Sequence, residues 1–302
     1  MCGIVGLFLK NRSLEPRLGG WLREMLIGMT DRGPDSSGLA IYSSSAGEGR
    51  VKFTLSHPDH GYPWHTLGTD LAEALGATAT IAARANHAVV VTDGPEAEVD
   101  LWLRRNHPEV RIVAIGQRME IFKDIGLPIE VSDRFGIAGM SGSHGIGHTR
   151  MATESAVTTE HAHPFSAGDD ICLVHNGSLS NHNELRRWLR RRGMSFETDN
   201  DSEVAARYFA YRMSEGASLG EALEAGLADL DGFYTFTVGT RDGFAVIRDG
   251  IAAKPAVLAE TDDWVAMASE YRSLAGLPGV DKAVVWEPKP ERIYTWHLEK
   301  AA

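Results

Sequence analysis

The chain has 302 residues, of which 43% are hydrophobic, and it carries a formal net charge of −11. This length and composition are sufficient for one large domain or two ordinary ones, each with its own core. The negative charge argues against a surface for nucleic acids or anionic membranes, and is compatible with a soluble protein or with a subunit that meets a basic partner.

The cysteine content and the lack of a recognisable targeting signal indicate the cellular compartment in which the protein is expected. The two cysteines, Cys2 and Cys172, cannot build a disulfide framework, and neither lies in a zinc-ligand pattern. The start of the chain has no basic and apolar leader, and no apolar run reaches the roughly 18 residues of a membrane span. We therefore expect a cytoplasmic protein without a structural metal or membrane contact.

The first elements alternate between strand and helix. Apolar periodicity predicts a strand over 4–9, an amphipathic helix over 18–29 and a strand over 37–42, with a Gly-Pro break at 30–35. Residues 43–67 predict irregular structure. Three histidines in that segment are separated by Pro and Gly, which argues against a metal site.

A small α/β unit follows. Its predicted elements are a helix over 70–76, a strand over 88–92, a helix over 96–106 and a strand over 110–115. Such a unit can bind a mononucleotide, but the turn at 92–95 lacks a glycine-rich phosphate loop. We interpret residues 44–135 as a structural insertion.

The second half of the chain predicts a strand over 171–174, followed by helices and then by more strands. The helices are expected over 204–213 and 219–230, after the capping residues Ser202 and Ser218, and the later strands over 233–238, 244–247, 256–258 and 264–268. A basic cluster at 186–192 has helical spacing, which is typical of a solvated helix face.

The start of the chain carries an unusual chemical arrangement. Removal of Met1 leaves Cys2 as the amino-terminal residue, and its own α-amine, with a pKa of roughly 8, can take the proton of a thiol with a pKa of roughly 8.5. With Met1 retained, the nitrogen is an amide without useful basicity, and the chain is expected to be inactive. The alternative is that Cys2 is a small apolar residue that opens a buried strand.

Six motifs, in this order, resemble the class II glutamine amidotransferase domain. They lie at residues 1–6, 32–38, 147–150, 163–165, 175–177 and 201–203, and stretches at 248–250 and 269–270 fit the second half of the same domain. This domain is the glutaminase module of glutamate synthase, glucosamine-6-phosphate synthase, asparagine synthetase and the amidophosphoribosyltransferase. The resemblance spans nearly the whole chain except residues 44–135.

The resemblance implies an α+β fold. The expected architecture is a four-layer αββα sandwich of the N-terminal nucleophile hydrolase type, with the small α/β insertion at 44–135. Residues 1–302 then form a single glutamine amidotransferase domain.

The same resemblance implies the catalytic residues. Cys2 attacks the side-chain amide of glutamine and forms a thioester, while Asn176 and Gly177 stabilise the oxyanion. The alternative for Asn176 and Gly177 is a plain hairpin turn.

The resemblance also implies how glutamine is held. Arg150 binds the α-carboxylate, Thr153 adds a hydroxyl contact, and Asp201 binds the α-ammonium group. The alternative for Asp201 is an anion at a helix start, and Asp199 competes with it for the role. The predicted substrate-binding residues are Arg150, Thr153, Asp201, His163 and Arg32, with no metal ligand.

The predicted partners follow from what the chain lacks. Only about 25 residues remain after the sandwich, so we expect the ammonia acceptor on another subunit. The stretches at 123–126 and 149–155 are similar to the stand-alone amidotransferase subunit of glutamate-synthase-like complexes, including that of N-methylglutamate synthase (methylamine-glutamate N-methyltransferase). The resemblance implies L-glutamine as substrate, a hetero-oligomer with glutamate-synthase-like subunits, no cofactor on this chain, and flavin and iron-sulfur clusters on the partners.

Two other functions stay open at this point. One is a structural or regulatory subunit that keeps the fold but does not need glutaminase activity. The other is a hydrolase that uses the same nucleophile on a different amide.

Overall fold

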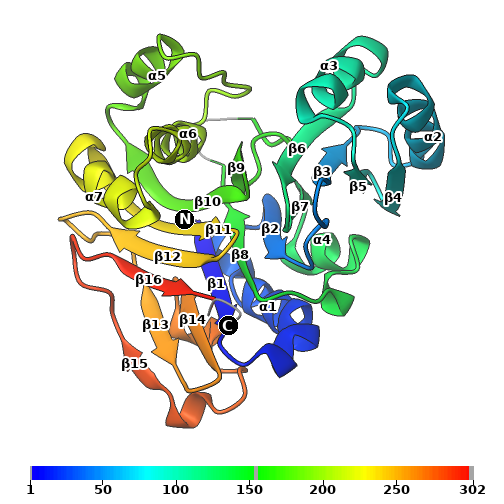
Figure 1. The fold of residues 1–302 in the computed structure, drawn as a ribbon. Coiled ribbons are helices and arrows are strands. Elements are labelled where there is room, and N and C mark those ends of the chain that lie inside the picture. The colour runs from blue at the N-terminus through cyan, green and yellow to red at the C-terminus, as the bar shows by residue number, and fades with distance from the viewer. Residues whose placement is uncertain (1, 153–155, 299–302) are drawn as a thin grey trace.

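The computed structural model describes residues 2–152 and 156–298, and within them the strands form three sheets (Figure 1). The β1 sheet contains, in spatial order, β15 (Val284–Trp286), β13 (Val257–Glu260), β14 (Trp264–Ala268), β1 (Gly3–Leu9), β8 (His144–Arg150), β2 (Ser36–Tyr42) and β7 (Met119–Ile125). The β10 sheet contains β16 (Tyr294–His297), β12 (Gly243–Arg248), β11 (Gly232–Thr240), β10 (Ile171–Leu179) and β9 (Phe165–Gly168). Neighbouring strands are antiparallel in both sheets.

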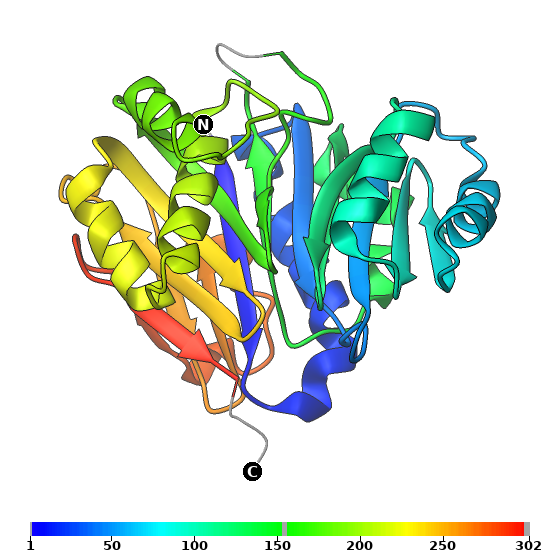
Figure 2. The ribbon, with the colours of Figure 1, turned by 45° about the horizontal axis from the view of Figure 1, so that its top comes forward.

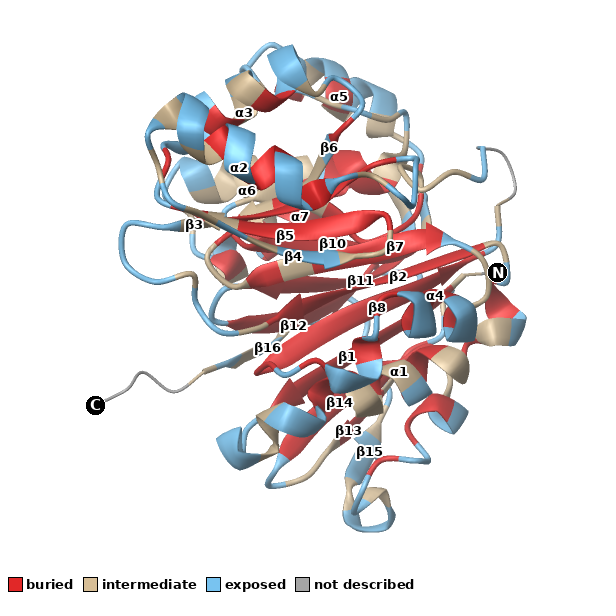
Figure 3. Cartoon of the chain, turned by 90° about the vertical axis from the view of Figure 1, so that its right-hand side faces the viewer, coloured by how far each residue is buried: buried red, intermediate tan, exposed pale blue. Residues whose placement is uncertain are grey.

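Helices cover the outer faces of these two sheets. The β1 sheet is covered by α1 (Leu18–Ile27) and α4 (Pro128–Arg134), and the β10 sheet by α5 (His182–Arg190), α6 (Asp201–Ser214) and α7 (Leu219–Asp229). Figure 2 shows these layers from a second direction, and in Figure 3 the sheets are largely buried while the helices expose their outer faces. The expected αββα sandwich is confirmed.

Strand β1 shows why the sequence adopts this architecture. All seven of its residues are buried. Val5, Leu7 and Leu9 pack in the core under α1, whereas Ile4 and Phe8 pack in the core between the two sheets. Successive side chains of a strand point to opposite faces, so a strand covered on both sides is apolar throughout. Each fully buried side chain of this kind contributes about 1.5–3 kcal/mol.

The insertion has a sheet and a core of its own. Its strands are, in spatial order, β4 (Ala79–Arg84), β5 (His87–Thr92), β3 (Val51–Ser56) and β6 (Arg111–Gly116), and α2 (Trp64–Leu75) and α3 (Glu96–Asn106) pack in the same core. The predicted strands and helices of this unit are present, and α2 begins earlier than predicted.

Strand β3 corrects the prediction of irregular structure over 43–67. It lies between β5 and β6 and pairs with both. Phe53 and Leu55 pack in the insertion core, while the alternating Lys52 and Thr54 are also buried. The burial of these polar residues hides the strand from an analysis that looks for continuous apolar runs, although the period of two is present.

The insertion sheet occupies a narrower range than the predicted insertion. It spans 51–116, whereas β7 also falls within 44–135 but pairs with β2 along its whole length in the β1 sheet. Helix α4 packs with α1 on the sandwich. The assignment of 1–302 to one domain stays a prediction.

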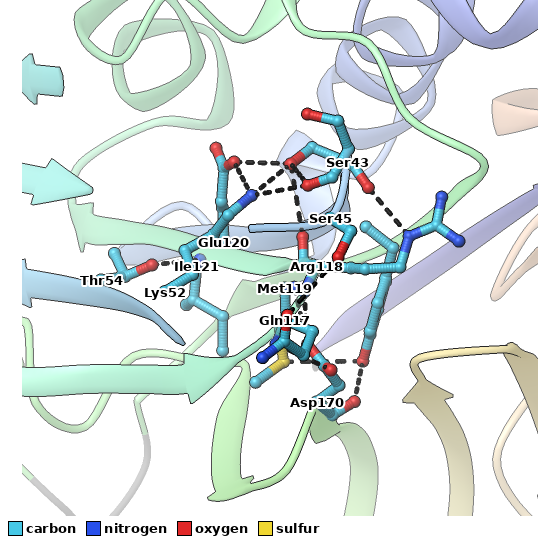
Figure 4. A network of polar contacts seen from close by, with 12 residues as sticks. Ser43, Ser45, Lys52, Thr54, Gln117, Arg118, Met119, Glu120, Ile121 and Asp170 are labelled. Carbon is cyan, nitrogen blue, oxygen red and sulfur yellow. Dashed lines mark hydrogen bonds and ion pairs between the residues drawn. The ribbon is translucent and has the colours of Figure 1, made fainter. Parts of the chain in front are cut away.

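A polar network joins the insertion to the sandwich where the chain returns from β6 (Figure 4). The buried carboxylate of Asp170 accepts hydrogen bonds from the backbone N–H groups of Gln117, Arg118 and Met119 at 2.8–2.9 Å, and from Arg241 Nε at 2.9 Å. Burial alone would raise the pKa of Asp170, but these donors outweigh it and hold the pKa below its ordinary value.

We expect Asp170→Asn to lower the free energy of unfolding at pH 7 by about 3 kcal/mol, because buried donors lose their acceptor. A carboxylate with a depressed folded-state pKa stabilises fully above its unfolded pKa of 3.8, and that contribution is lost as the pH falls through the folded value. The difference between wild type and variant in urea unfolding should therefore be constant from about pH 5 to 7 and shrink below about pH 4. The exposed neighbour Asp169 provides the control Asp169→Asn, and equal losses in both variants would contradict this role.

Within residues 2–152 and 156–298, no helix combines the length and apolar character needed to cross a membrane.

Candidate active site

Several predicted site residues lie at the same end of the central strands of the β1 sheet. Gly3 lies opposite Thr149 in the pairing of β1 with β8, so the start of β1 meets the end of β8. Arg150, the last residue of β8, lies opposite Ser36 at the start of β2. Antiparallel pairing thus places Cys2, Arg150 and the segment before β2 at the same end of these strands.

The backbone around Cys2 is fixed by buried polar contacts. Arg32 Nε donates to the carbonyl of Cys2 at 2.9 Å, and another nitrogen of the same guanidinium contacts Glu270 at 2.8 Å. The N–H of Ile4 donates to Ser269 Oγ at 3.0 Å. Arg32 was predicted to bind substrate; the structure places its guanidinium against the backbone of the nucleophile, and its contact with substrate stays a prediction.

The two cysteines differ in accessibility. Cys172 is fully buried, its sulfur lies 3.3 Å from the hydroxyl of Tyr42, and burial raises the pKa of its thiol to about 12. Cys2 is partly exposed. Because nucleophilic attack needs an accessible thiolate, Cys2 is the reactive candidate of the pair.

Arg150 is a buried cation close to the nucleophile. Its side chain donates to the carbonyl of Ala156 at 2.9 Å. Burial lowers the pKa of Arg150, and the charges of Cys2 and Asp35 act against that shift, so both lie within electrostatic reach. Asp35 in turn accepts a hydrogen bond from the N–H of Ala152 at 2.8 Å. Thr153, predicted to assist Arg150, lies outside the described residues.

Asn176 and Gly177 lie within a strand, which excludes the plain hairpin turn. Strand β10 continues beyond the predicted end at residue 174, and Asn176 and Gly177 pair with Thr235 and Tyr234 of β11. Gly177 has φ of 152°, and a Cβ there would lie 2.1 Å from the carbonyl oxygen of Phe233, so only glycine fits.

The side-chain amide of Asn176 is a buried donor without an acceptor in the described part of the chain. The residue is 1% exposed, and its Nδ2 has no hydrogen-bond partner among the described residues. Its neighbour His175 is tied to β8 across the two sheets, because His148 Nε2 donates to the His175 carbonyl at 2.9 Å. This contact places the Asn176 region beside the strand that carries Arg150.

The structure distinguishes the two candidate aspartates. Asp201 accepts hydrogen bonds from the N–H of Leu179 at 2.9 Å and from Ser202 Oγ at 3.2 Å, and its side chain is 20% exposed. Burial alone would raise the pKa of Asp201, but His175 and the Leu179 N–H outweigh it and lower that pKa. The carboxyl group therefore stays ionised.

Asp199 instead lies at the surface. Its side chain is 84% exposed and contacts His161 at 3.2 Å. Geometry thus favours Asp201 for the site.

A histidine cluster that the sequence analysis did not predict supports Asp201. Ser202 Oγ lies 2.8 Å from His163 Nε2 and 2.9 Å from His175 Nδ1, and the rings of His148 and His163 stack with centroids 3.9 Å apart. Burial lowers the pKa of His148 to about 3 and that of His163 well below its ordinary value, so both are neutral at pH 7. His163, predicted to bind substrate, contacts Ser202 in the first turn of α6, and its contact with substrate stays a prediction. His148 and His175 each lie within one of the sequence motifs, and this was the signal from which the histidine cluster could have been predicted.

The basic cluster at 186–192 is a solvated helix face, as interpreted, at Arg187 and at residues 190–192, which are exposed, and it differs from that interpretation only at Arg186. Arg186 is buried and donates to the carbonyls of Thr198 and Asn200, at 3.0 Å for the latter. It therefore holds the loop that leads into α6 and Asp201.

Strand β7 holds residues 159–164, which lead into β9. The buried ammonium of Lys123 donates to the carbonyls of Ala162 at 2.7 Å and of Glu160 and Pro164 at 3.3 Å each. The next residue, Asp124, accepts from Thr159 Oγ1 at 2.7 Å. Burial lowers the pKa of Lys123 to about 8.

We expect Lys123→Met to accelerate amide hydrogen exchange in residues 156–164 by about 10- to 100-fold, because charged hydrogen bonds are worth about 1.5–3 kcal/mol each. Lys52→Met is the matched control. Lys52 is also buried, but its ammonium contacts Glu120 and Ser43 in the polar network of Figure 4 and not residues 156–164. Equal acceleration in both variants would show general destabilisation rather than a specific tie.

Across the described part of the chain, no group of three or more His, Cys, Asp or Glu side chains has the arrangement to hold a metal ion. The chemistry available at this edge is that of a thiol, a buried guanidinium, a carboxylate and an amide donor. The absence of cofactors from this chain stays a prediction.

Comparison with known proteins shows similarity to glutamine amidotransferases and glutamine amidotransferase-like proteins. The family described as "Glutamine amidotransferase domain" matches residues 148–276. The glutamine amidotransferase-like protein GlxB of Rhizobium meliloti is 57% identical over 303 residues, which cover 100% of both chains. A putative glutamine amidotransferase of Methanothermobacter thermautotrophicus is 33% identical over 97% of this chain and 99% of its own length.

Among solved structures, the glutamine phosphoribosylpyrophosphate amidotransferase of B. subtilis matches with a TM-score of 0.60 at 18% sequence identity. The match covers 98% of this chain and 49% of that protein, so this chain spans about half of its length. At this identity the likeness concerns the fold alone, and it agrees with the expected α+β sandwich.

Proposed function

This chain belongs to the class II glutamine amidotransferase family, and we propose on that premise that it hydrolyses L-glutamine to glutamate and ammonia through a thioester on Cys2. The observation that supports this most is the strand pairing that brings the partly exposed Cys2 next to the end of β8, which carries Arg150, while the His148 contact ties the neighbour of Asn176 to the same strand; the Asn176 Nδ2 is buried without a hydrogen-bond partner among the described residues. Such a set can bind an amino acid and stabilise negative charge on an amide oxygen.

Binding uses charges at opposite ends of the substrate. Arg150 takes the α-carboxylate in a bidentate contact, and the ionised Asp201 takes the α-ammonium group. Thr153 assists at the carboxylate end. Fixing both ends of the amino acid leaves the side-chain amide near the Cys2 sulfur, which removes most of the orientational freedom of the reaction.

The chemistry begins once Met1 is removed. The α-amine of Cys2 takes the thiol proton, and the sulfur attacks the amide carbon to form a carbon-sulfur bond. Negative charge then develops on the carbonyl oxygen, and the Asn176 side-chain amide and the Gly177 N–H stabilise it by about 3–4 kcal/mol per donor.

Collapse of this intermediate breaks the carbon-nitrogen bond. The α-ammonium of Cys2 returns its proton to the leaving nitrogen, so ammonia departs and a thioester remains. Water, deprotonated by the same amine, attacks the thioester and releases glutamate together with the free thiol. Arg32 contributes by fixing the Cys2 carbonyl, and His163 by supporting Ser202 beside Asp201.

We further propose that the ammonia passes to a glutamate-synthase-like partner subunit, such as that of an N-methylglutamate synthase, in a cytoplasmic hetero-oligomer. This assignment rests on the sequence resemblance at 123–126 and 149–155. Flavin and iron-sulfur clusters would then belong to the partners. A native pull-down that recovers proteins with the absorption spectra of flavin and iron-sulfur clusters would support the assignment.

The alternative is a structural or regulatory subunit of the same complex that has no need of glutamine hydrolysis. Glutamate release should be measured on the purified chain, with removal of Met1 verified by mass spectrometry, both alone and with its co-purified partners. Turnover in either preparation supports the glutaminase. If neither the chain alone nor the chain with its co-purified partners releases glutamate, with Met1 removed in both preparations, the structural or regulatory subunit is favoured.

A further inference from the structure

The ion pair of Arg32 with Glu270 belongs to a closed ring of four charged side chains near the start of β1. Glu270 Oε1 accepts from Arg32 at 2.8 Å, and Glu270 Oε2 contacts Arg272 Nε at 2.8 Å. Arg272 also donates to Asp31 at 2.9 Å, and Asp31 precedes Arg32 in the chain. The ring therefore joins the segment before β2 to the segment after β14.

Both of these segments hold the first residues of the mature chain. Arg32 Nε donates to the carbonyl of Cys2 at 2.9 Å. Ser269, which precedes Glu270, is hydrogen-bonded to Ile4 in both directions: the Ile4 N–H donates to Ser269 Oγ at 3.0 Å, and the Ser269 N–H donates to the Ile4 carbonyl at 2.9 Å. The nucleophile is thus held by two segments that the ring ties together.

Cys2 depends on this support more than a residue inside a strand would. Once Met1 is removed, no chain precedes its nitrogen, and the pairing of β1 with β8 begins only at Gly3. The carbonyl that Arg32 holds fixes the plane of the Cys2–Gly3 peptide, relative to which the α-amine and the thiol of Cys2 can otherwise rotate. This matters for the reaction, because a displacement of about 1 Å can cost about 100-fold in rate.

Glu270 supplies the countercharge that orients Arg32. Arg32 is 8% exposed, and Glu270 is its ion-pair partner among the described residues. The Nη2 of Arg32 is buried without a hydrogen-bond partner in that part of the chain, so the contacts of Nε and Nη1 direct the side chain. A guanidinium presents its donors in a rigid, planar fork. Holding Nη1 on Glu270 therefore aims Nε at the Cys2 carbonyl.

We propose that Glu270 is a positioning residue for the glutaminase reaction, which acts through Arg32 to keep the amine and the thiol of Cys2 aligned with the bound amide. The inference rests on the proposed function and gives Glu270 no contact with substrate. Arg272 contributes less, because its side chain is 46% exposed and that of Asp31 is 80% exposed. Ion pairs between exposed groups add little to stability.

The division of the effect between kcat and KM tests this role. Glu270→Gln keeps the size of the side chain but removes its charge. It should lower kcat for glutamine about 10- to 100-fold and change KM less than about threefold, because Arg150 and Asp201 still hold the substrate. Glu270→Asp restores the charge and should fall between Glu270→Gln and wild type. Arg272→Ala should lower kcat by less than about fivefold.

Glu260→Gln is the matched control. The side chains of Glu260 and Glu270 are 33% and 34% exposed, and Glu260 also forms an ion pair, with Lys10. Lys10, however, follows the end of β1 that lies away from Cys2. The kcat of Glu260→Gln should stay within about twofold of wild type. Equal losses of kcat in the two glutamine variants would show general destabilisation and would overturn the positioning role.

A double-mutant cycle tests whether Glu270 acts through Arg32. Arg32→Lys keeps the positive charge but removes the fork that contacts Cys2 and Glu270 together. If the effect passes through the guanidinium, adding Glu270→Gln to Arg32→Lys should lower kcat by less than about twofold more. Losses that multiply as for independent sites would overturn the action through Arg32.

The carbonyl of Cys2 gives a readout that needs no turnover. Cys2–Gly3 is the only Cys-Gly pair in the sequence, so a chain labelled with carbonyl-¹³C cysteine and ¹⁵N glycine gives one Cys-Gly signal in an HNCO spectrum. Glu270→Gln should move this signal in the same direction as Arg32→Ala does, with circular dichroism unchanged. Glu260→Gln should leave the signal in place.

The outcomes separate the positioning role from the proposed function. An unmoved signal in Glu270→Gln would overturn the orientation of Arg32 by Glu270, and a moved signal with unchanged kcat would overturn the role in catalysis. If Glu270→Gln does not fold, Glu270→Asp gives the same two measurements, with smaller expected changes. If the wild-type chain releases no glutamate after removal of Met1, the proposed function fails, and the Cys2 signal still decides whether Glu270 orients Arg32.

Discussion

Replacement of Cys2 by alanine should lower glutamine hydrolysis by at least about 10⁴-fold, the scale of loss when a covalent nucleophile is removed. The reason is chemical: without the sulfur no thioester forms, and neither Arg150 nor Asn176 can replace it. Glutamate release by the purified chain, with Met1 removed, measures the effect. Folding should be unchanged, because Cys2 is partly exposed and its backbone contacts to Arg32 do not involve the side chain.

Cys172→Ala is the matched control for this prediction. Its thiol is buried with a pKa of about 12, so the variant should lose some stability but keep its turnover per folded molecule. If Cys172→Ala abolished activity and Cys2→Ala did not, the assignment of the nucleophile would be wrong. Isothermal titration of glutamine into the Cys2→Ala chain should still show binding, since the charges that hold the substrate are retained.

The fold was predictable where one strand or helix carries its own pattern. Strand β1 is apolar throughout because both of its faces are covered, and α7 begins at a capping box in which Ser218 and Glu221 satisfy each other's backbone donors. Strand β3 was missed because its polar alternate residues are buried by tertiary contacts such as the pair of Lys52 with Glu120. A local pattern contains no information about that partner.

The site was predictable in its composition but not in its supports. The motifs named Cys2, Arg150, Asn176 and Asp201, and the structure brings their segments to one region. The supports are contacts between distant segments: His148 with His175 across two sheets, and Lys123 with the carbonyls of residues 160–164. Such contacts depend on strand register and sheet stacking, which spacing along the chain does not reveal.

Asn176→Ala should lower kcat about 10²- to 10³-fold, the usual effect of deleting one oxyanion donor, while KM for glutamine changes less than about threefold. The amide is buried, and Nδ2 has no hydrogen-bond partner among the described residues, so its removal breaks no hydrogen bond of that nitrogen within them. The charge it serves exists only after the sulfur has attacked. Ground-state binding through Arg150 and Asp201 should therefore be preserved.

The division of the effect between kcat and KM is what distinguishes an oxyanion donor from a structural residue. Asn176→Asp keeps the size of the side chain but replaces the donor by a carboxylate, so it should be at least as inactive as Asn176→Ala. Ser178→Ala on the same strand is the control, because Ser178 is exposed and has no proposed role in the reaction. A large rise in KM with unchanged kcat in Asn176→Ala would place this amide on the ground-state substrate, and the charge stabilisation would then fall to the Gly177 N–H alone.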